Sequence, residues 1–195
     1  MDLKEKSGSV IFPVDSEHSA IWQCLAGEKM EQVRRLVLTG SGGPFRKRDI
    51  DSFATISVEE ALNHPNWDMG QKITIDSATM MNKGFEVIEA HWLFDLNPDQ
   101  IEIVVHPQSI IHSMVEFNDS SIKAQMGVPD MKVPIQYALT YPDHFSADWE
   151  RLDFMDYNQL TFESVDTQKF PSILLAYDAL ENGPSYSVVL NVAND

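Results

Sequence analysis

The sequence has only one cysteine, no long apolar run and no hydrophobic stretch at its beginning. With Cys24 alone, no disulfide can form within the chain, which fits a reducing compartment. Cys24 lies among apolar residues and is expected to be a small buried side chain. No run of about 18 apolar residues occurs, and residues 1–8 do not form a signal peptide. We therefore expect a cytoplasmic protein with no membrane partner.

Basic residues are scarce, with 14 lysines and arginines against 30 aspartates and glutamates, so the net charge is -16. Such a surface repels a phosphate backbone, and no nucleic-acid partner is expected. It also repels small anions, so any anion site must be built locally from a metal ion, a lysine or helix N-termini. Hydrophobic residues make up 43% of the 195 residues, which is enough for a buried core.

Predicted strands and helices alternate along the chain. Apolar runs predict strands at residues 9–14, 34–39, 72–76 and 101–105, and a hairpin of 112–117 with 121–126. Helices are predicted at 16–25, 77–94, 131–140 and 171–181, with a short one at 57–63. The short helix interrupts a long loop over residues 46–71, and such loops often form lids. The fold class is therefore predicted as α/β or α+β, with a small mixed sheet packed with helices.

Two carboxylates follow the first predicted strand directly, at Asp15 and Glu17. If the extended geometry continues, both point to the same side. Carboxylates held close together repel each other unless a cation lies between them, and oxygen ligands suit Mg²⁺ or Mn²⁺. The alternative is that both residues only cap and charge the first turn of the next helix.

The predicted helix 77–94 carries Asn82, Lys83 and Glu86 within a mostly apolar stretch. Asn82 and Glu86 are four residues apart and share a helix face. Their apolar neighbours favour a position facing a pocket. The alternative is a surface ion pair between Lys83 and Glu86, worth ~0.3–0.5 kcal/mol.

Two segments are candidates for anion binding. Ser77 stands at the predicted start of helix 77–94, where free N–H groups and a hydroxyl make an anion seat. The alternative is an ordinary helix cap. The Gly-rich turn around Ser41 offers further N–H groups, but it lacks the Gly-Lys-Ser/Thr of a Walker A loop.

The long loop contains a candidate lid at residues 64–70, centred on Trp67. An indole and a thioether on a mobile loop can cover a ligand and exclude water. The alternative is an apolar anchor that pins the loop. His106 and His112 are interpreted as structural histidines, because no third histidine or cysteine lies at metal-ligand spacing.

Seven motifs occur in an order that resembles the 1-deoxy-D-xylulose-5-phosphate reductoisomerase family. They are PVDSEH at 13–18, LTGSGGPF at 38–45, HPNWDMG at 64–70, DSATMMNKG at 76–84, IVVHPQS at 103–109, GVPDM at 127–131 and LNVAN at 190–194. The resemblance covers residues 8–195. An unrelated metal-dependent hydrolase would need all seven motifs to agree by chance.

The resemblance implies a function. The family converts 1-deoxy-D-xylulose 5-phosphate to 2-C-methyl-D-erythritol 4-phosphate in the non-mevalonate isoprenoid pathway, with NADPH and Mg²⁺ or Mn²⁺, as a homodimer. It implies a metal site of Asp15, Glu17 and Glu86. Around that site it implies substrate-binding or catalytic roles for Ser16, Ser41, His64, Trp67, Ser77, Asn82, Lys83 and His112, with Met69 and Gly70 toward the cofactor. Pro129 and Met131 are expected near the active site.

The family also has parts that this sequence does not show. Its N-terminal Rossmann domain, with a Gly-rich fingerprint, is absent, so NADPH binding is expected to need that missing domain. We expect a catalytic metal- and substrate-binding domain at 1–150, a connector at 151–170 and the start of a truncated C-terminal helical domain at 171–195. Alone, the chain is expected to be inactive, and the alternative function is a module that binds metal and phosphorylated ligand without turnover.

Overall fold

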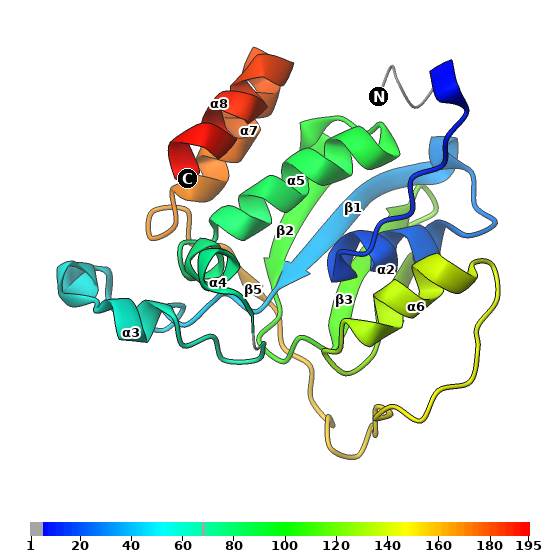
Figure 1. Ribbon diagram of the computed structural model, residues 1–195, viewed down its shortest axis with the longest axis horizontal. Helices are drawn as coiled ribbons and strands as arrows, with labels where there is room; N and C mark the ends of the chain where they lie inside the picture. The colour runs from blue at the N-terminus through cyan, green and yellow to red at the C-terminus, as the bar shows by residue number, and fades with distance from the viewer. Residues whose placement is uncertain (1–5, 68) are drawn as a thin grey trace.

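The computed structural model describes residues 6–67 and 69–195. Its centre is a five-stranded mixed sheet in the order β4-β3-β1-β2-β5 (Figure 1). The strands are β1 (Val33–Gly40), β2 (Ile101–Val105), β3 (Ile111–Phe117), β4 (Ile122–Met126) and β5 (Glu163–Ser164). β1 and β2 run parallel, whereas β1–β3, β3–β4 and β2–β5 are antiparallel. The predicted mixed fold class is confirmed.

Helices α2 and α5 pack directly on this sheet, whereas α3 contacts α4 and α8 contacts α7. The described helices are α2 (Ser16–Leu25), α3 (Val58–Ala61), α4 (Gln71–Ala78), α5 (Met81–Phe94), α6 (Lys132–Thr140), α7 (Ser172–Asn182) and α8 (Pro184–Asn194). Three 3₁₀ turns join them, η1 (Met30–Gln32), η2 (Ile50–Thr55) and η3 (Pro98–Gln100). Figure 1 shows α5 between α2 and α7, so side chains of α5 are enclosed from several directions. The predicted helices at 16–25, 131–140 and 171–181 and the predicted hairpin are confirmed.

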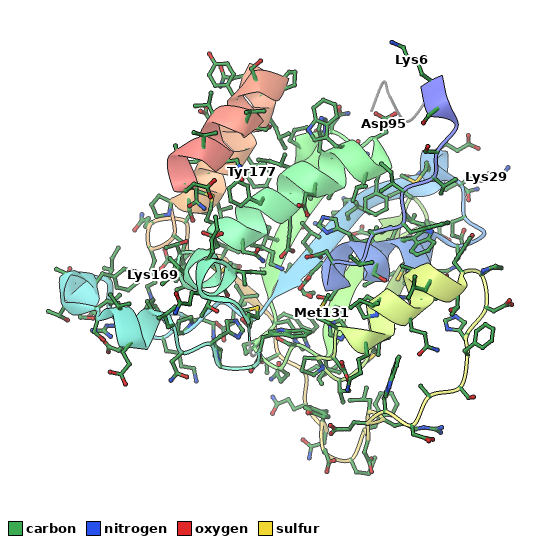
Figure 2. The ribbon with its side chains drawn as sticks, in the orientation of Figure 1. Lys6, Lys29, Asp95, Met131, Lys169 and Tyr177 are labelled. Atoms are coloured by element: carbon green, nitrogen blue, oxygen red, sulfur yellow. The ribbon has the colours of Figure 1, made fainter. Side chains whose placement is uncertain are left out.

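The core forms where the sheet meets α2 and α5. Leu36 and Leu38, two apart on β1, are fully buried together with Ile21 of α2 and Val87 of α5. Alternation along the strand thus places one face of the sheet against the helices. Tyr177 extends the core on α7 (Figure 2), where its hydroxyl donates to the carbonyl of Ile101 at 2.7 Å.

Two predictions near the site are wrong in an informative way. Residues 72–76 form part of helix α4 rather than a strand, although Ile73, Thr74 and Ile75 favour β structure. The single predicted helix 77–94 is two helices, because Met80 takes a left-handed φ of 61° between α4 and α5. Packing of α4 against α5 overrides the local preference.

The predicted strand at 9–14 is also wrong. These residues pair with no described strand, and Val10 is 68% exposed. Phe12 instead packs its ring on Trp22, with the centroids 5.0 Å apart. An apolar run predicts burial by some partner, but its length does not say whether the partner is a sheet or a few aromatic side chains.

Further elements were not predicted. β5 is a two-residue edge strand within the predicted connector, and α8 follows α7 after Gly183. Helix α7 packs against α8. The signal was present, because Pro184 at the first position of α8 is a favoured helix start.

Cys24 and the lengths of the helices bear on two further expectations. Cys24 is buried, and burial raises the pKa of its thiol to about 11, as expected for an inert small side chain. In the described part of the chain, every helix is too short or too polar to cross a bilayer.

Candidate active site

A pocket of about 320 Å³ opens where β1 ends and where α2 and α5 begin. Most of the residues singled out in the sequence line it, namely Asp15, Ser16, Glu17, Ser41, His64, Trp67, Met69, Ser77, Asn82, Lys83, Glu86, His112 and Met131. Gly70 does not line it; it caps α4, where its carbonyl accepts from Thr74. Pro129 is likewise outside the lining. Thr39, Gly40 and Ser109 line it without having been predicted.

Asp15 both caps a helix and faces the pocket. Its Oδ1 accepts from the backbone N–H groups of Glu17 at 3.0 Å and His18 at 3.4 Å, which explains why α2 begins at Ser16. All of its described hydrogen bonds go to Oδ1. Capping and metal binding are therefore compatible, because Oδ2 remains available to a cation.

The three carboxylates expected to bind a metal converge. Ligand oxygens of Asp15, Glu17 and Glu86 all lie within 4.8 Å of one another. Asp15 and Glu17 come from the start of α2, whereas Glu86 comes from the second turn of α5. This spacing suits an oxygen-ligated divalent cation, and Mg²⁺ or Mn²⁺ fits the donor set.

A buried lysine lies inside this carboxylate cluster. The Nζ of Lys83 is 2.6 Å from Glu86 Oε2 and 3.2 Å from Glu17 Oε1. Asn82 donates from Nδ2 to the other Glu86 oxygen at 2.7 Å. The Lys83–Glu86 pair is thus a buried interaction facing a pocket, and the alternative of a surface ion pair is wrong.

The route of the Lys83 side chain depends on Gly40. A Cβ on Gly40 would lie 2.8 Å from Cε of Lys83, too close for real contacts. Glycine at the end of β1 therefore leaves the space through which the lysine stem passes. The sequence showed Gly40 only as part of a Gly-rich turn.

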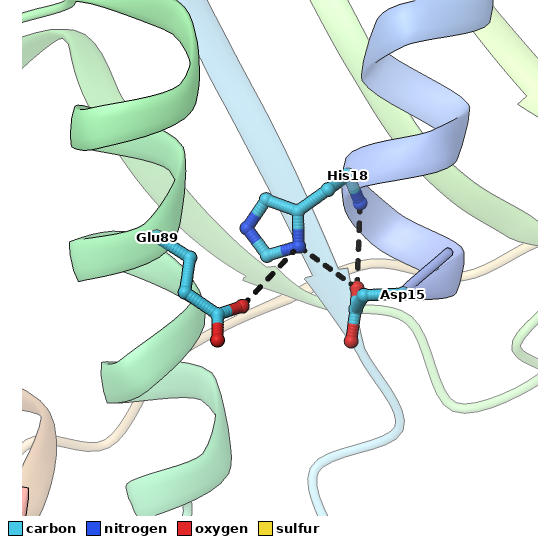
Figure 3. Close-up of side chains that lie close together, drawn as sticks. All are labelled: Asp15, His18 and Glu89. Carbon is cyan, nitrogen blue, oxygen red and sulfur yellow. Dashed lines mark hydrogen bonds and ion pairs between the residues drawn. The ribbon is translucent and has the colours of Figure 1, made fainter. Parts of the chain in front are cut away.

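A second residue group supports the cluster from behind (Figure 3). His18 is fully buried; its Nδ1 is 2.9 Å from Asp15 Oδ1 and 3.6 Å from Glu89 Oε2. Its Nε2 is 2.9 Å from the backbone carbonyl of Glu86. One imidazole thus ties the Asp15 carboxylate to the helix that carries Glu86. Glu89 was not predicted, and its only sequence signal is a position one turn beyond Glu86.

Burial and charge perturb these groups strongly. Burial raises the pKa of Glu86 well above its usual 4.5, and the negative charge of Glu17 adds to the shift. Burial also raises the pKa of Glu17, against the opposing charge of Lys83. For Asp15, burial acts upward, but the hydrogen bond and charge of His18 outweigh it and lower the pKa. For Lys83, burial acts downward, but the charges of Glu17 and Glu86 outweigh it and raise the pKa.

These shifts describe a site with too little positive charge. Raised carboxylate pKa values mean that ionising both buried glutamates costs free energy that one ammonium does not offset. A divalent cation between the three carboxylates would supply the missing charge. The electrostatics therefore agree with the donor geometry.

The predicted lid lies over the opposite side of the pocket. Trp67 is half-buried, with its indole 6.4 Å from the imidazole of His112, and His64 Nε2 is 3.2 Å from Ser41 Oγ. Asn66 donates to the carbonyl of Pro107 at 2.9 Å and so anchors one end of the segment. Asp68, which belongs to the predicted lid, lies outside the described residues. Both interpretations of this segment, lid and anchor, thus have a structural counterpart.

The predicted anion seat needs a correction. Ser77 lines the pocket but lies near the C-terminal end of α4, so it does not start a helix or offer free N–H groups there. The left-handed turn at Met80 is the reason. The carbonyl of Ser77 instead lies against Gly43, whose φ is 67°. Any side chain at position 43 would place its Cβ 2.6 Å from that oxygen, so only glycine fits. Ser41 and Ser77 are thereby held on one wall.

The histidines after β2 have mainly backbone partners. His106 Nδ1 donates to the carbonyl of Thr161 at 2.9 Å, and His112 Nε2 is 3.1 Å from the carbonyl of Gly127. Within residues 6–67 and 69–195, neither belongs to a group that could hold a metal. Burial lowers the pKa of His112, so it faces the pocket as a neutral imidazole.

The C-terminal motif contacts helix α4, which contributes Ser77 to the pocket. Asn194 donates to Asp76 Oδ1 at 2.8 Å, and Lys72 joins Asp76 and Asp195 at 3.0 and 3.2 Å. Helix α4, which carries Ser77, is therefore held from α8. This contact gives the 190–194 motif a structural role.

A mixed α/β domain with clustered carboxylates near a strand end, beside a pocket lined in part by a long loop, is typical of metal-dependent enzymes that act on small polar substrates. The comparisons with known proteins agree on one family within this class. Two family models match, the 1-deoxy-D-xylulose 5-phosphate reductoisomerase C-terminal domain over residues 11–94 and the DXP reductoisomerase C-terminal domain over residues 126–195. The chain belongs to the 1-deoxy-D-xylulose 5-phosphate reductoisomerase family.

Curated relatives of that name align with nearly the whole chain. The enzyme of Chloroherpeton thalassium is 63% identical over 99% of this chain and 50% of its own length. That of Bacteroides thetaiotaomicron is 54% identical over 99% and 50%. The chain therefore spans about half the length of the curated relatives it matches.

Solved structures of the family have the same fold. A DOX-P reductoisomerase in complex with NADPH, fosmidomycin and magnesium matches with a TM-score of 0.92 and 46% identity, over 97% of this chain and 49% of that one. The reductoisomerase of Zymomonas mobilis in complex with NADPH matches with a TM-score of 0.91 and 46% identity, over 98% and 49%.

Proposed function

We propose that this chain is the metal- and substrate-binding part of an enzyme that rearranges 1-deoxy-D-xylulose 5-phosphate and reduces it, with NADPH, to 2-C-methyl-D-erythritol 4-phosphate. The observation that carries the proposal is the convergence of Asp15, Glu17 and Glu86 beside a pocket that Lys83, Ser41 and Ser77 also line. In the family fold, a similar structure binds NADPH, fosmidomycin and magnesium.

Asp15, Glu17 and Glu86 would hold Mg²⁺ or Mn²⁺. When bound, such an ion acts as a Lewis acid toward the substrate's carbonyl and hydroxyl oxygens and stabilises developing negative charge. Ser16 lies beside this position, with its hydroxyl donating to Glu17 Oε2 at 2.7 Å, and is proposed to contact the oxygens of the substrate.

The phosphate would bind in the same pocket. Ser41, Ser77, Asn82 and Lys83 are the donors that line it, and Asn82 and Lys83 contact the carboxylates in the structure. Lys83 supplies positive charge in a protein whose net charge is -16. Holding the phosphate orients the reacting carbons, because binding energy from a remote group is used for positioning.

His64, Trp67 and Met69 would close over the bound substrate, next to His112 of β3. Trp67 and Met69 offer apolar surface that excludes water from a reactive aldehyde. Met69, which lines the pocket, would face the nicotinamide, with Gly70 beside it at the start of α4.

The remaining features belong to the intact protein. We propose that residues 1–150 form the catalytic domain, 151–170 the connector and 171–195 a C-terminal helical region. NADPH binding, a homodimeric assembly and a cytoplasmic location are proposed for the intact enzyme, in line with the resemblance. The curated relative from Chloroherpeton thalassium is about twice as long as this chain.

The test is a calorimetric titration of the chain with Mn²⁺ or Mg²⁺, followed by fosmidomycin. Binding of fosmidomycin should require the metal and should change the fluorescence of Trp67. A Glu17→Gln variant should lose both responses, whereas Glu59→Gln, an exposed glutamate away from the pocket, should keep them. Binding of fosmidomycin that ignores both metal and Glu17 would contradict the proposed site.

A second candidate function is a binding module without turnover. The half-length coverage of the relatives favours it for the chain on its own. Hydride transfer needs the nicotinamide held against the substrate, and such orientation accounts for ~7–11 kcal/mol of a barrier. NADPH oxidation by the purified chain with substrate and Mn²⁺ should therefore be far slower than by an intact relative. Comparable turnover would rule this candidate out.

A further inference from the structure

Two residues assigned above to the phosphate are bound to metal ligands in the structure. The ammonium of Lys83 contacts Glu86 Oε2 and Glu17 Oε1, and the Asn82 amide donates to Glu86 Oε1. Both carboxylate oxygens of Glu86 therefore accept hydrogen bonds from phosphate-site donors. The donors and the proposed metal compete for the same oxygens.

The electrostatic energies in this competition are large because the site is buried. The side chains of Lys83 and Glu86 are 8% and 4% exposed, so water screens their charges little. A divalent cation among these carboxylates attracts the oxygens that Lys83 holds and repels its ammonium. The Lys83 ammonium then loses its carboxylate partners, and repulsion by the cation favours its displacement.

The pocket also contains groups that could hold the released ammonium. The Lys83 side chain passes Gly40, where the absence of a side chain leaves room for its stem. The same pocket contains Ser41 and Ser77. An anion seated between these serines would give the released ammonium a new partner.

Resting on the proposed function, we propose that Lys83 and Asn82 form a switch with two sets of partners. In one state they neutralise Glu17 and Glu86, and in the other they bind the phosphate group of the substrate. Metal binding drives the change between them. The metal and the phosphate therefore strengthen each other's binding through these two side chains, beyond their direct attraction.

Linkage makes this coupling measurable in both directions. If Mg²⁺ lowers the dissociation constant of inorganic phosphate, phosphate must lower that of Mg²⁺ by the same factor. We expect about a tenfold effect, within the usual range of coupling between two sites. In Lys83→Met the factor should fall to less than half, since only the direct attraction between the ions is left.

The experiment uses the purified 195-residue chain. Inorganic phosphate is titrated at zero and at saturating Mg²⁺, and Mg²⁺ at zero and at saturating phosphate. The ε-ammonium signal of Lys83 is followed by nitrogen-15 NMR and assigned by its loss in Lys83→Arg, which keeps the positive charge. The matched control is Lys123→Met, which removes the same charge from a lysine that is 48% exposed and pairs with Glu28, away from the pocket lining. It should keep the coupling of the unchanged chain.

The NMR signal reports the switch directly, even if Lys83→Met folds poorly. Hydrogen exchange of the Lys83 ammonium with water should become faster when Mg²⁺ is added and slow again when phosphate follows. An ammonium that stays slowly exchanging with Mg²⁺ bound, or equal coupling in the unchanged chain and Lys83→Met, overturns the switch alone. If Glu86→Gln leaves Mg²⁺ affinity unchanged, the proposed metal site itself fails.

Discussion

The molecule contains two clusters of charged side chains that differ in burial and in balance. In the pocket, Lys83 lies between Glu17 and Glu86, and these three side chains are 8%, 15% and 4% exposed. At the far end of β1, Arg34 and Arg35 bind Glu116, and Arg35 also pairs with Glu102. There the arginines are 60% and 40% exposed.

The difference separates structure from function. The sheet cluster matches two positive charges with two negative ones and ties β1 to its neighbours β2 and β3. The pocket cluster places one ammonium against Asp15, Glu17 and Glu86 in a buried setting. Buried carboxylates without enough positive charge cost folding free energy unless a cation binds among them. The charge imbalance therefore indicates the functional site.

The largest expected effect is on stability, in the pocket cluster. Lys83→Met leaves the buried carboxylates without their partner and should lower the free energy of unfolding by about 3 kcal/mol in the presence of a chelator. Saturating Mn²⁺ should restore part of this loss, because the ion supplies the missing charge. Urea unfolding with and without Mn²⁺ measures both values. A loss no greater than that of an exposed arginine variant would contradict the contrast between the clusters.

The next largest effect is on metal affinity. Glu86→Gln removes one of three anionic ligands and should weaken Mn²⁺ binding about a hundredfold, measured by calorimetry. Glu59→Gln is the control, because Glu59 is exposed and belongs to neither carboxylate group that contains Asp15, so its effect should be much smaller. Equal losses in the two variants would mean that Glu86 contributes only general negative charge.

The third effect depends on pH and sharpens the role of His18. Burial acts to lower the pKa of His18, but the hydrogen bond and charge of Asp15 outweigh it and raise the pKa above 6.5. The folded protein therefore holds this proton more tightly than the unfolded chain. The stabilisation is fully present below pH 6.5 and is lost as the pH rises through the folded pKa.

His18→Gln should accordingly cost about 1–2 kcal/mol at low pH and less at high pH. Urea unfolding of both proteins across this range measures the difference. His91→Gln is the control, because His91 lies at the far end of α5 and contacts the carbonyl of Leu96. A difference that grows with rising pH would have the wrong sign for this account.

The smallest effect is expected at the balanced cluster. Arg34→Met removes one exposed partner of Glu116 while Arg35 keeps its own contact at 2.5 Å. Arg34 is 60% exposed, and Arg35 keeps the buried Glu116 carboxylate paired, so the melting temperature should fall by less than about 4 °C. Metal affinity should not change. A large loss of either quantity would show that the two clusters are not separate.

The sequence by itself determined the family, the identity of the candidate metal ligands and much of the local structure. Helix α2 could be predicted because Asp15 caps it within three residues, and the β3–β4 hairpin because its turn residues lie between two short runs. These features depend on neighbours close in the chain. The ordered motifs carry the family in the same way, because each is a short local run.

Only the tertiary structure decided which partners the site residues have. The β-branched residues of α4 favour a strand, but packing against α5 and contacts from α8 hold them in a helix. Lys83 and Glu86 read equally well as a surface pair until α5 is placed between α2 and α7 over the sheet. Gly40 and His18 gain their roles only from residues far along the chain. Local periodicity reports which face of an element is apolar, whereas burial of a charge depends on what packs over it, and that is settled by the whole fold.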